Sequence, residues 1–163
     1  MYQAAILIAS DQGYAGTRED LCTPYLKELL KEQGYKVVDC RILPDEQQQL
    51  EEAMKDICDN IKPQLLLTSG GTGLSPRDCM PEATVAIAQR MVPGIAEAMR
   101  AYSMQFTKRA MFSRAVAATR KQTLIINLPG SPKAVKECME AIIEELPHAL
   151  GIMMNIERNC ARK

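Results

Sequence analysis

The sequence predicts an α/β protein with a mostly parallel sheet and helices on both faces, a three-layer α/β/α arrangement. Strand-like and helix-like segments alternate along the chain, and this order favours parallel strands joined by right-handed crossovers. Residues 4–9 form a continuous apolar run, as expected of a strand that is covered on both sides. The 163-residue length suits one domain, which we expect to span residues 1–163.

A helix is expected after this first strand and a polar stretch. It should end near Gln33, because Gly34 is the residue type usually found just past a helix end. Its start is open between two interpretations. One is a capping box formed by Thr17 and Asp20, and the other is an N-cap at Thr23 followed by proline in the first turn.

Two more strands and a helix follow in the middle of the chain. Residues 35–43 are expected to form the second strand, and a helix opens at residues 44–46 and ends at Pro63. The apolar residues of this helix form one stripe at helical spacing: Leu50, Ala53, Met54, Ile57, Cys58 and Ile61. Residues 65–68 form the third strand, and a loop covers residues 69–78.

The second half of the chain departs from strict alternation. Helical segments are expected over residues 81–105, with a break at Pro93-Gly94. Residues 115–118 and 122–127 are expected to form one short antiparallel hairpin. A last helix begins at Ser131-Pro132, since serine is a good N-cap and proline suits the first turn. Its apolar stripe comprises Val135, Cys138, Met139, Ile142, Ile143 and Leu146.

Composition argues against several classes of protein. Lys and Arg number 20, as do Asp and Glu, so the formal net charge is zero. This balance argues against a nucleic-acid binder that relies on broad phosphate neutralisation. The first ten residues carry no basic segment, and their apolar run ends at Asp11, too early for a signal peptide or a membrane span. We therefore expect a cytoplasmic protein without a membrane partner.

The cysteines and the single histidine are expected to be structural. The cysteines are Cys22, Cys40, Cys58, Cys79, Cys138 and Cys160. None forms a Cys-x-x-Cys pair, and His148 has no cysteine neighbour, so the sequence shows no zinc site. Most fall among apolar residues, which favours reduced thiols in a reducing compartment, with disulfides as the alternative. His148 follows Pro147 near a helix end and is given no catalytic role.

The strongest functional signal is the loop Ser69-Gly70-Gly71-Thr72-Gly73, which we call the glycine loop. Ligands of open α/β sheets bind beyond the carboxyl ends of the strands, where this loop is expected. Three glycines let the backbone approach a ligand, and successive N–H groups can hold an anion. A tight turn without a ligand is the alternative. The loop is not a Walker A sequence, because no Lys-Ser or Lys-Thr pair follows its last glycine.

Two carboxylates are expected at the same edge of the sheet. Asp45 follows the second strand, and Asp78 follows the glycine loop. Beside a phosphate-binding loop, this pair suits Mg²⁺, which takes one or two carboxylates plus phosphate oxygens and waters. Such an ion would neutralise charge in phosphoryl or nucleotidyl transfer. The alternatives are that Asp45 only caps a helix and that Asp78 is a helix-terminal charge or a partner of Arg77.

Other polar segments follow strands at this edge. Ser10 and Asp11 come directly after the first strand. Pro129-Gly130-Ser131 opens the last helix, whose free N–H groups together with Lys133 suit a phosphate, although a plain helix start would have the same sequence. Ser113-Arg114 is a candidate for further polar and cationic contacts, with solvated surface charge as the alternative.

These motifs resemble the Mog/MoaB family of molybdenum-cofactor biosynthesis, to which the gephyrin G domain belongs. The likeness extends over nearly the whole chain and is carried by Ser10-Asp11 with Gly16 and Asp20, Pro44-Asp45-Glu46, Thr68 to Asp78, Pro81-Glu82-Ala83-Thr84, Ser113-Arg114-Ala115 and Leu128-Pro129-Gly130-Ser131-Pro132. Within this family, the chain resembles the molybdopterin adenylyltransferase subgroup most. This likeness rests on Pro44-Asp45-Glu46 and Arg120-Lys121-Gln122. One departure is Cys79-Met80, where family members commonly carry a pair such as Val-Thr.

The resemblance implies an activity and the residues that perform it. Such enzymes use Mg²⁺ and ATP: the terminal phosphate of molybdopterin attacks the α-phosphate of ATP, and pyrophosphate leaves. Asp45 and Asp78 match the functional aspartates of the family. The molybdopterin-binding segments match Ser69, Gly70, Gly71, Thr72, Gly73, Pro129, Gly130 and Ser131, with Lys133 beside them. Ser10 and Asp11 match a segment near the nucleotide, and we assign Ser113 and Arg114 to the same nucleotide site.

The resemblance also implies partners. A homotrimer is expected, and the product would pass to a molybdate-inserting enzyme. Two alternatives remain: a MoaB-like protein that binds molybdopterin without catalysis, and a trimeric scaffolding module. The presence of both Asp45 and Asp78 weighs against the first, and the short chain weighs against the second.

Overall fold

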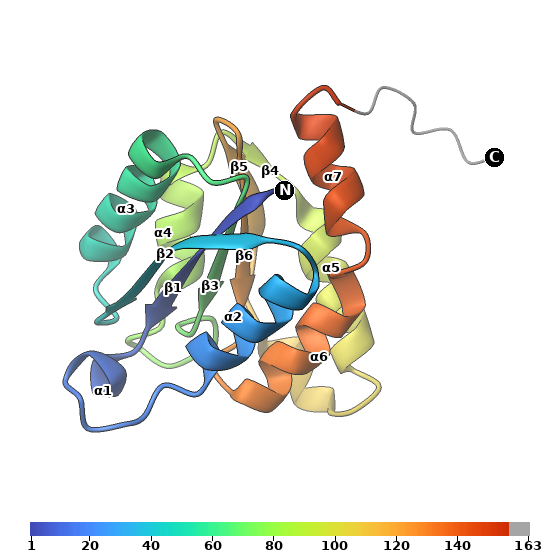
Figure 1. Ribbon diagram of the computed structural model, residues 1–163. Coiled ribbons are helices and arrows are strands. Elements are labelled where there is room, and N and C mark those ends of the chain that lie inside the picture. The colour runs from blue at the N-terminus through green and yellow to red at the C-terminus, as the bar shows by residue number, and fades with distance from the viewer. Residues whose placement is uncertain (157–163) are drawn as a thin grey trace.

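A six-stranded sheet lies between two layers of helices in the computed structural model, which describes residues 1–156 (Figure 1). The strands are β1 (Gln3–Ala9), β2 (Lys36–Leu43), β3 (Leu65–Ser69), β4 (Arg90–Met91), β5 (Ala117–Arg120) and β6 (Thr123–Leu128). Their order is β2-β1-β3-β6-β5-β4. The first four strands in this order are parallel, and β5 runs antiparallel to both β6 and β4. The predicted fold class is confirmed.

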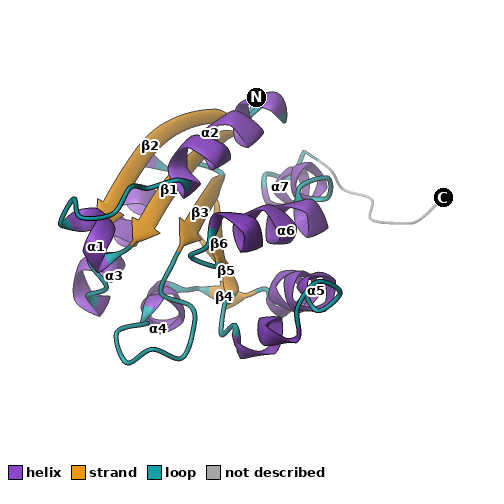
Figure 2. Cartoon of the chain, turned by 90° about the horizontal axis from the view of Figure 1, so that it is seen from below, coloured by secondary structure: helices purple, strands orange, loops and turns teal. Residues whose placement is uncertain are grey.

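Two groups of helices cover the two faces of the sheet, as Figure 2 shows from below. One face packs against α2 (Cys22–Glu32), α5 (Pro93–Ser103), α6 (Pro132–Ile142) and α7 (Leu146–Met153). The other face packs against α3 (Gln47–Asp56), its π-helical continuation η1 (Ile57–Ile61) and α4 (Met80–Ile87). The short helices α1 (Asp11–Tyr14) and η2 (Lys108–Phe112) lie in connecting segments. Among the described residues, no helix has the length and apolar composition needed to cross a bilayer.

The interior strand β1 shows why residues 4–9 are all apolar. Ala4, Ile6 and Ile8 belong to one core cluster, whereas Ala5, Leu7 and Ala9 belong to the cluster on the opposite face. A parallel strand between two helical layers has no solvent face, so neither alternate position can be polar. The same packing buries Cys22, Cys58 and Cys138, and these three thiols are free, as are Cys40 and Cys79. Cys160 lies outside the described residues.

The strand register brings four loops to one edge of the sheet, which we call the carboxyl edge. Ile8 of β1 pairs with Ser69 of β3, and Ser69 pairs with Leu128 of β6, so these strands end level with one another. The Ser10 N–H donates to the Leu43 carbonyl at 2.9 Å, which holds the end of β2 beside the end of β1. The loops after β1, β2, β3 and β6 therefore face a common space.

Three local expectations need correction. Neither predicted cap starts α2: the Asp20 carboxylate accepts from the Cys22 and Thr23 N–H groups at 2.9 and 3.1 Å. The break between the two helices of the 81–105 region comes before Pro93 and not at Pro93-Gly94. After α4 the chain forms β4, and Pro93 then starts α5. The hairpin turn lies at Lys121-Gln122 and not at residues 119–121, between the expected strands, since β5 pairs through Arg120. Of the three differences, the addition of β4 reflects pairing with a segment distant in sequence.

The β5–β6 hairpin is fastened to η1 by an ion pair. The Arg120 Nε and Nη2 atoms donate to the two carboxylate oxygens of Asp59 at 3.0 and 2.6 Å. Arg120 Nη1 also donates to the Ile87 carbonyl at 3.0 Å, so one guanidinium joins three elements. These hydrogen bonds lower the pKa of Asp59 to about 2.

We expect Asp59→Asn to destabilise the protein in a pH-dependent manner. The pKa of Asp59 is lowered in the folded state, so its stabilisation is present above the ordinary pKa of the carboxyl and is lost as pH falls towards about 2. The urea midpoints of the wild type and the variant should therefore differ at pH 6 and converge as pH falls through this window. A constant difference over the whole range would contradict the assignment.

Candidate functional site

Two cavities open side by side at the carboxyl edge. The first cavity has a volume of about 600 Å³ and is lined mainly by the loops that follow β1, β2 and β3 and by the start of α6. The second cavity, of about 420 Å³, lies between the glycine loop, α5, η2 and α6. They share Gly71, Asp78, Gly130 and Ser131. A ligand in one cavity would therefore meet a ligand in the other at these four residues.

The glycine loop lies directly against the strand ends. Gly70 has φ +95°, and a Cβ there would collide with the Ala9 carbonyl oxygen. The Gly70 N–H donates to the Leu128 carbonyl at 3.2 Å, and Ser69 Oγ donates to the Pro129 carbonyl at 2.8 Å. A side chain at Gly70 would push the loop away from both neighbouring strands, so glycine is required by close approach as well as by backbone conformation.

The same loop passes beside both predicted carboxylates. A Cβ at Gly71 would lie 3.1 Å from Asp45 Oδ1, and a Cβ at Gly73 would lie 2.9 Å from Asp78 Oδ2. Both aspartates line the first cavity. The structure thus brings the glycine loop, Asp45 and Asp78 together, as expected from their positions after neighbouring strands.

Asp45 does not cap the helix that follows it. The N-cap residue of α3 is Glu46, which makes no side-chain capping bond, and Asp45 Oδ2 instead accepts from the Asp11 N–H at 3.1 Å. Asp45 Oδ1 is buried without a hydrogen-bond partner. Burial raises the pKa of Asp45, and the nearby carboxylates of Asp11 and Asp78 raise it further. An unpaired buried carboxylate oxygen is stabilised by a cation, because burial penalises the ionised form most when nothing compensates its charge.

Asp78 is fixed by its own loop and not by its neighbour Arg77. Asp78 Oδ2 accepts from the Ser75 N–H at 3.2 Å, and the Asp78 N–H donates to the Ser75 carbonyl at 2.9 Å. The Arg77 guanidinium turns away to Asp11 and Glu46. The alternative in which Arg77 neutralises Asp78 is therefore wrong.

Arg114 holds the glycine loop from the side of the second cavity. Its N–H donates to the Thr72 carbonyl at 2.8 Å, its Nε to the Gly73 carbonyl at 2.8 Å, and its Nη2 to the Asp78 carbonyl at 3.0 Å. Its Nη1 pairs with Glu82. The guanidinium is thus engaged mainly with the loop backbone.

The candidate nucleotide contacts fall into two groups. Ser10 and Asp11 line the first cavity, whereas Ser113 lines the second and Arg114 lines neither. Ser10 Oγ caps α1 by accepting from the Gly13 N–H at 2.9 Å. The assignment of Ser113 and Arg114 to the nucleotide stays a prediction, and the geometry separates them from Ser10 and Asp11.

The turn before α6 contributes to both cavities. Gly130 and Ser131 line both, and Pro129 lines the second. Ser131 Oγ accepts from the Ala134 N–H at 3.2 Å, which confirms its predicted role as the N-cap of α6. Lys133 lies in the first turn of α6 and lines neither cavity. His148 lies on α7, outside the lining of both.

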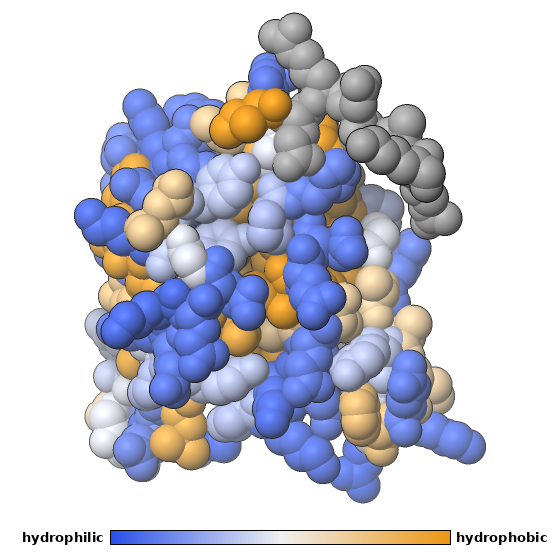
Figure 3. Space-filling model, turned by 45° about the vertical axis from the view of Figure 1, so that its right-hand side comes forward, coloured by the Kyte–Doolittle hydropathy of each residue, from blue (hydrophilic) through white to orange (hydrophobic). Residues whose placement is uncertain are grey.

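Sequence reasoning missed most of the second cavity. Its walls include Met99, Arg100, Ser103, Arg109 and Phe112. These residues belong to α5 and η2, whose local sequences carry no ligand-binding motif. Phe112 is 53% exposed in the structure, which no pattern in the sequence indicates. In Figure 3, hydrophilic atoms cover most of the face shown, and hydrophobic atoms appear in recesses between them.

The donor set at this edge limits the metals that could bind. No group of three or more His, Cys, Asp or Glu side chains within residues 1–156 is arranged to hold a metal ion. Two carboxylates, one with an unpaired buried oxygen, fit Mg²⁺, which completes its coordination with phosphate oxygens and waters. They do not fit a metal that requires a full set of protein ligands.

Fold and site together define an α/β protein with two adjoining cavities beside a glycine-rich loop and two carboxylates at the carboxyl edge of its sheet. Residues 5–148 match the family described as "Probable molybdopterin binding domain", and the chain belongs to this family.

Named relatives agree with this membership. The chain is 37% identical over 151 residues to the molybdopterin adenylyltransferase of Helicobacter pylori strain J99, covering 91% of this chain and 86% of the relative. It is 41% identical over 135 residues to the Escherichia coli K12 protein of the same name, covering 82% and 69%. The crystal structure of the molybdopterin biosynthesis enzyme MoaB from Thermus thermophilus has a TM-score of 0.90 at 41% identity, covering 95% of this chain and 98% of that one. The predicted resemblance to the Mog/MoaB family is confirmed.

We expect Gly70→Ala to be strongly destabilising. The new methyl group would strike the Ala9 carbonyl in a left-handed backbone conformation, so the loss should be roughly 2–5 kcal/mol. Gly94→Ala is the matched control, because Gly94 lies inside α5 with φ outside the left-handed region and no atom near its Cβ position. Urea unfolding should show a large loss for the first variant and none for the second. Equal stabilities would contradict the close approach at Gly70.

Proposed function

We propose that this chain is a molybdopterin adenylyltransferase, which transfers AMP from Mg-ATP to the terminal phosphate of molybdopterin. The main observation in support of this activity is that Asp45 and Asp78 lie beside the glycine loop. Asp45 Oδ1 is buried there without a hydrogen-bond partner. The names of the Helicobacter and Escherichia relatives support the same activity.

The two cavities suit the two substrates. We assign the nucleotide to the larger first cavity, beside Ser10 and Asp11, and molybdopterin to the second. Phe112 and Met99 offer apolar and aromatic surface for a flat ring, and Arg109 adds a cationic group. The phosphates of both substrates would meet at the residues shared by the cavities, which places the attacking oxygen close to the α-phosphate.

The protein's contribution to the reaction is positioning and charge. Bound Mg²⁺ would supply positive charge for the transferring phosphoryl group. Asp45 and Asp78 would hold this ion, and the N–H groups of the glycine loop and of the first turn of α6 would bind phosphate oxygens. The attacking phosphate oxygen is already ionised at neutral pH, so the reaction needs no side chain as general base.

The proposal extends to assembly and location. We expect a cytoplasmic homotrimer that passes its adenylylated product to a molybdate-inserting enzyme. Analytical ultracentrifugation should give a particle of three times the 18.1 kDa chain mass. Sedimentation as a monomer at micromolar concentration would contradict the trimer without affecting the assignment of the site.

Asp45→Asn and Asp78→Asn should each abolish most of the transfer activity. Loss of one ionised ligand removes several kcal/mol of charge stabilisation, which corresponds to roughly 10²–10³-fold in kcat. The measurement is pyrophosphate release from ATP with molybdopterin and Mg²⁺ present. Molybdopterin binding, followed by fluorescence, should survive both substitutions, because the second cavity and the loop backbone are unchanged.

Each contrary outcome has a defined meaning. Full activity in either variant would contradict the two-carboxylate site. Failure of the wild-type protein to release pyrophosphate while it binds molybdopterin would favour a binding protein without catalysis. Absence of both binding and release would leave only the scaffolding alternative.

A further inference from the structure

Arg77 joins three loops of the carboxyl edge. Its Nε and Nη2 donate to Asp11 Oδ2 and Oδ1, both at 3.0 Å, and its Nη1 lies 2.8 Å from Glu46 Oε1. Asp11 starts α1, Glu46 precedes α3, and Arg77 belongs to the loop after β3. About half of the Arg77 side chain is exposed, and it lines the first cavity. This bidentate fork fixes both the position and the plane of the Asp11 carboxylate.

Asp11 and Asp45 hold each other through reciprocal hydrogen bonds. The Asp11 N–H donates to Asp45 Oδ2 at 3.1 Å, and the Asp45 N–H donates to Asp11 Oδ1 at 3.0 Å. Three of the four carboxylate oxygens are therefore engaged, two of Asp11 and one of Asp45. The fourth, Asp45 Oδ1, is the buried oxygen without a partner, beside the Cβ position of Gly71.

Two carboxylates in this arrangement repel each other unless a cation compensates. The Arg77 guanidinium holds the pKa of Asp11 below its usual value, whereas the charge of Asp11 contributes to the raised pKa of Asp45. Without Arg77, Asp11 would be free to turn towards solvent, since its side chain is 43% exposed. The Asp45 N–H would then lose its acceptor, Asp11 Oδ1, and with it the bond that ties the Asp45 backbone to the loop after β1.

We propose that Arg77 is a positioning residue for the metal-dependent step. By holding Asp11 Oδ1 against the Asp45 N–H, it fixes the backbone from which the Asp45 side chain extends, so that Oδ1 of Asp45 is left for a divalent cation. Arg77 acts through Asp11 and does not itself contact the reacting phosphates. This inference rests on the proposed adenylyl transfer, but its central claim concerns cation binding and can be tested without turnover.

The first test measures Mn²⁺ as a probe of the cation site. We expect Arg77→Ala to weaken Mn²⁺ binding about tenfold, both to the free protein and in the presence of ATP, as followed by electron paramagnetic resonance. Pyrophosphate release should show a similar fall in kcat, with the KM for molybdopterin unchanged. Arg77→Lys should recover only part of the loss, because lysine keeps the charge but cannot form the planar fork.

A double-mutant cycle tests whether Arg77 acts through Asp11. In the Asp11→Asn background the bidentate fork to Arg77 is already lost, so Arg77→Ala should weaken Mn²⁺ binding much less than in the wild-type background. An equal effect in both backgrounds would show that Arg77 acts directly, and it would overturn the proposal.

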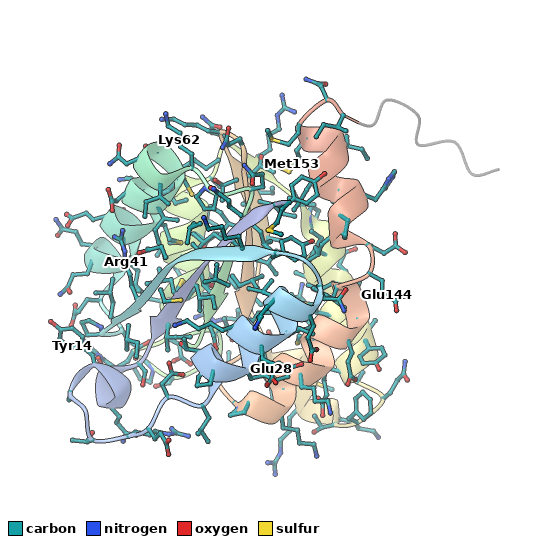
Figure 4. All side chains as sticks on the ribbon, in the orientation of Figure 1. Tyr14, Glu28, Arg41, Lys62, Glu144 and Met153 are labelled. Atoms are coloured by element: carbon teal, nitrogen blue, oxygen red, sulfur yellow. The ribbon has the colours of Figure 1, made fainter. Side chains whose placement is uncertain are left out.

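Arg41 provides a matched control outside the cavities. It also bridges two carboxylates, Asp39 at 2.8 Å and Asp56 at 2.6 Å, and it is labelled in Figure 4. Arg41 is 30% exposed, and ion pairs near the surface add little to stability. Arg41→Ala should leave Mn²⁺ binding and turnover unchanged, with a small fall in melting temperature like that of Arg77→Ala.

The outcomes separate this inference from the proposed function. Wild-type Mn²⁺ affinity in Arg77→Ala, or the same change in Arg41→Ala, would overturn the positioning role. If the wild-type protein releases no pyrophosphate, adenylyl transfer fails as the function, and the Mn²⁺ titrations still decide whether Arg77 orders the Asp45 site.

Discussion

The candidate site depends on the close approach of the Gly70 backbone to the Ala9 carbonyl. Because no side chain separates them, the loop after β3 lies directly on the end of β1 and remains hydrogen-bonded to β6 through Leu128. This contact places the next residues of the loop beside Asp45 and Asp78. The parallel strands β1, β3 and β6 end level with one another, which brings the Gly70 backbone near the Ala9 carbonyl. Glycine makes this close approach sterically possible.

Two arginines at the carboxyl edge bind different kinds of protein group. Arg77 compensates the carboxylates on the side of the first cavity, and Arg114 binds the backbone carbonyls of the glycine loop on the other side. Both are engaged with protein groups, so under the proposed function phosphate charge in the first cavity would be met by loop N–H groups, by a bound cation and by Arg18, which also lines this cavity. A formally neutral protein can thereby handle highly charged ligands without a broad basic surface.

Much of the architecture follows from local patterns. Alternating apolar segments predicted the parallel sheet, the stripe beginning at Val135 predicted the buried face of α6, and Ser131 predicted its N-cap. The strand β4 and the second cavity were not predictable in this way, whereas the start of α2 is set locally by the Asp20 carboxylate. β4 exists because Arg90 and Met91 pair with β5, and the second cavity exists because η2 packs beside α5 and α6. These contacts join segments far apart in sequence.

The sequence by itself determined which residues gather at the carboxyl edge, because hydrophobic periodicity and turn chemistry set the order of strands and loops. The sequence alone was compatible with two roles for Asp45, a helix cap and a metal ligand. Only the tertiary structure excluded the helix cap, because the partner of Asp45 is Asp11, 34 positions earlier, and the partner of Asp11 is Arg77, 66 positions later. Side-chain pairing of this kind depends on strand register and loop packing, which local sequence does not encode.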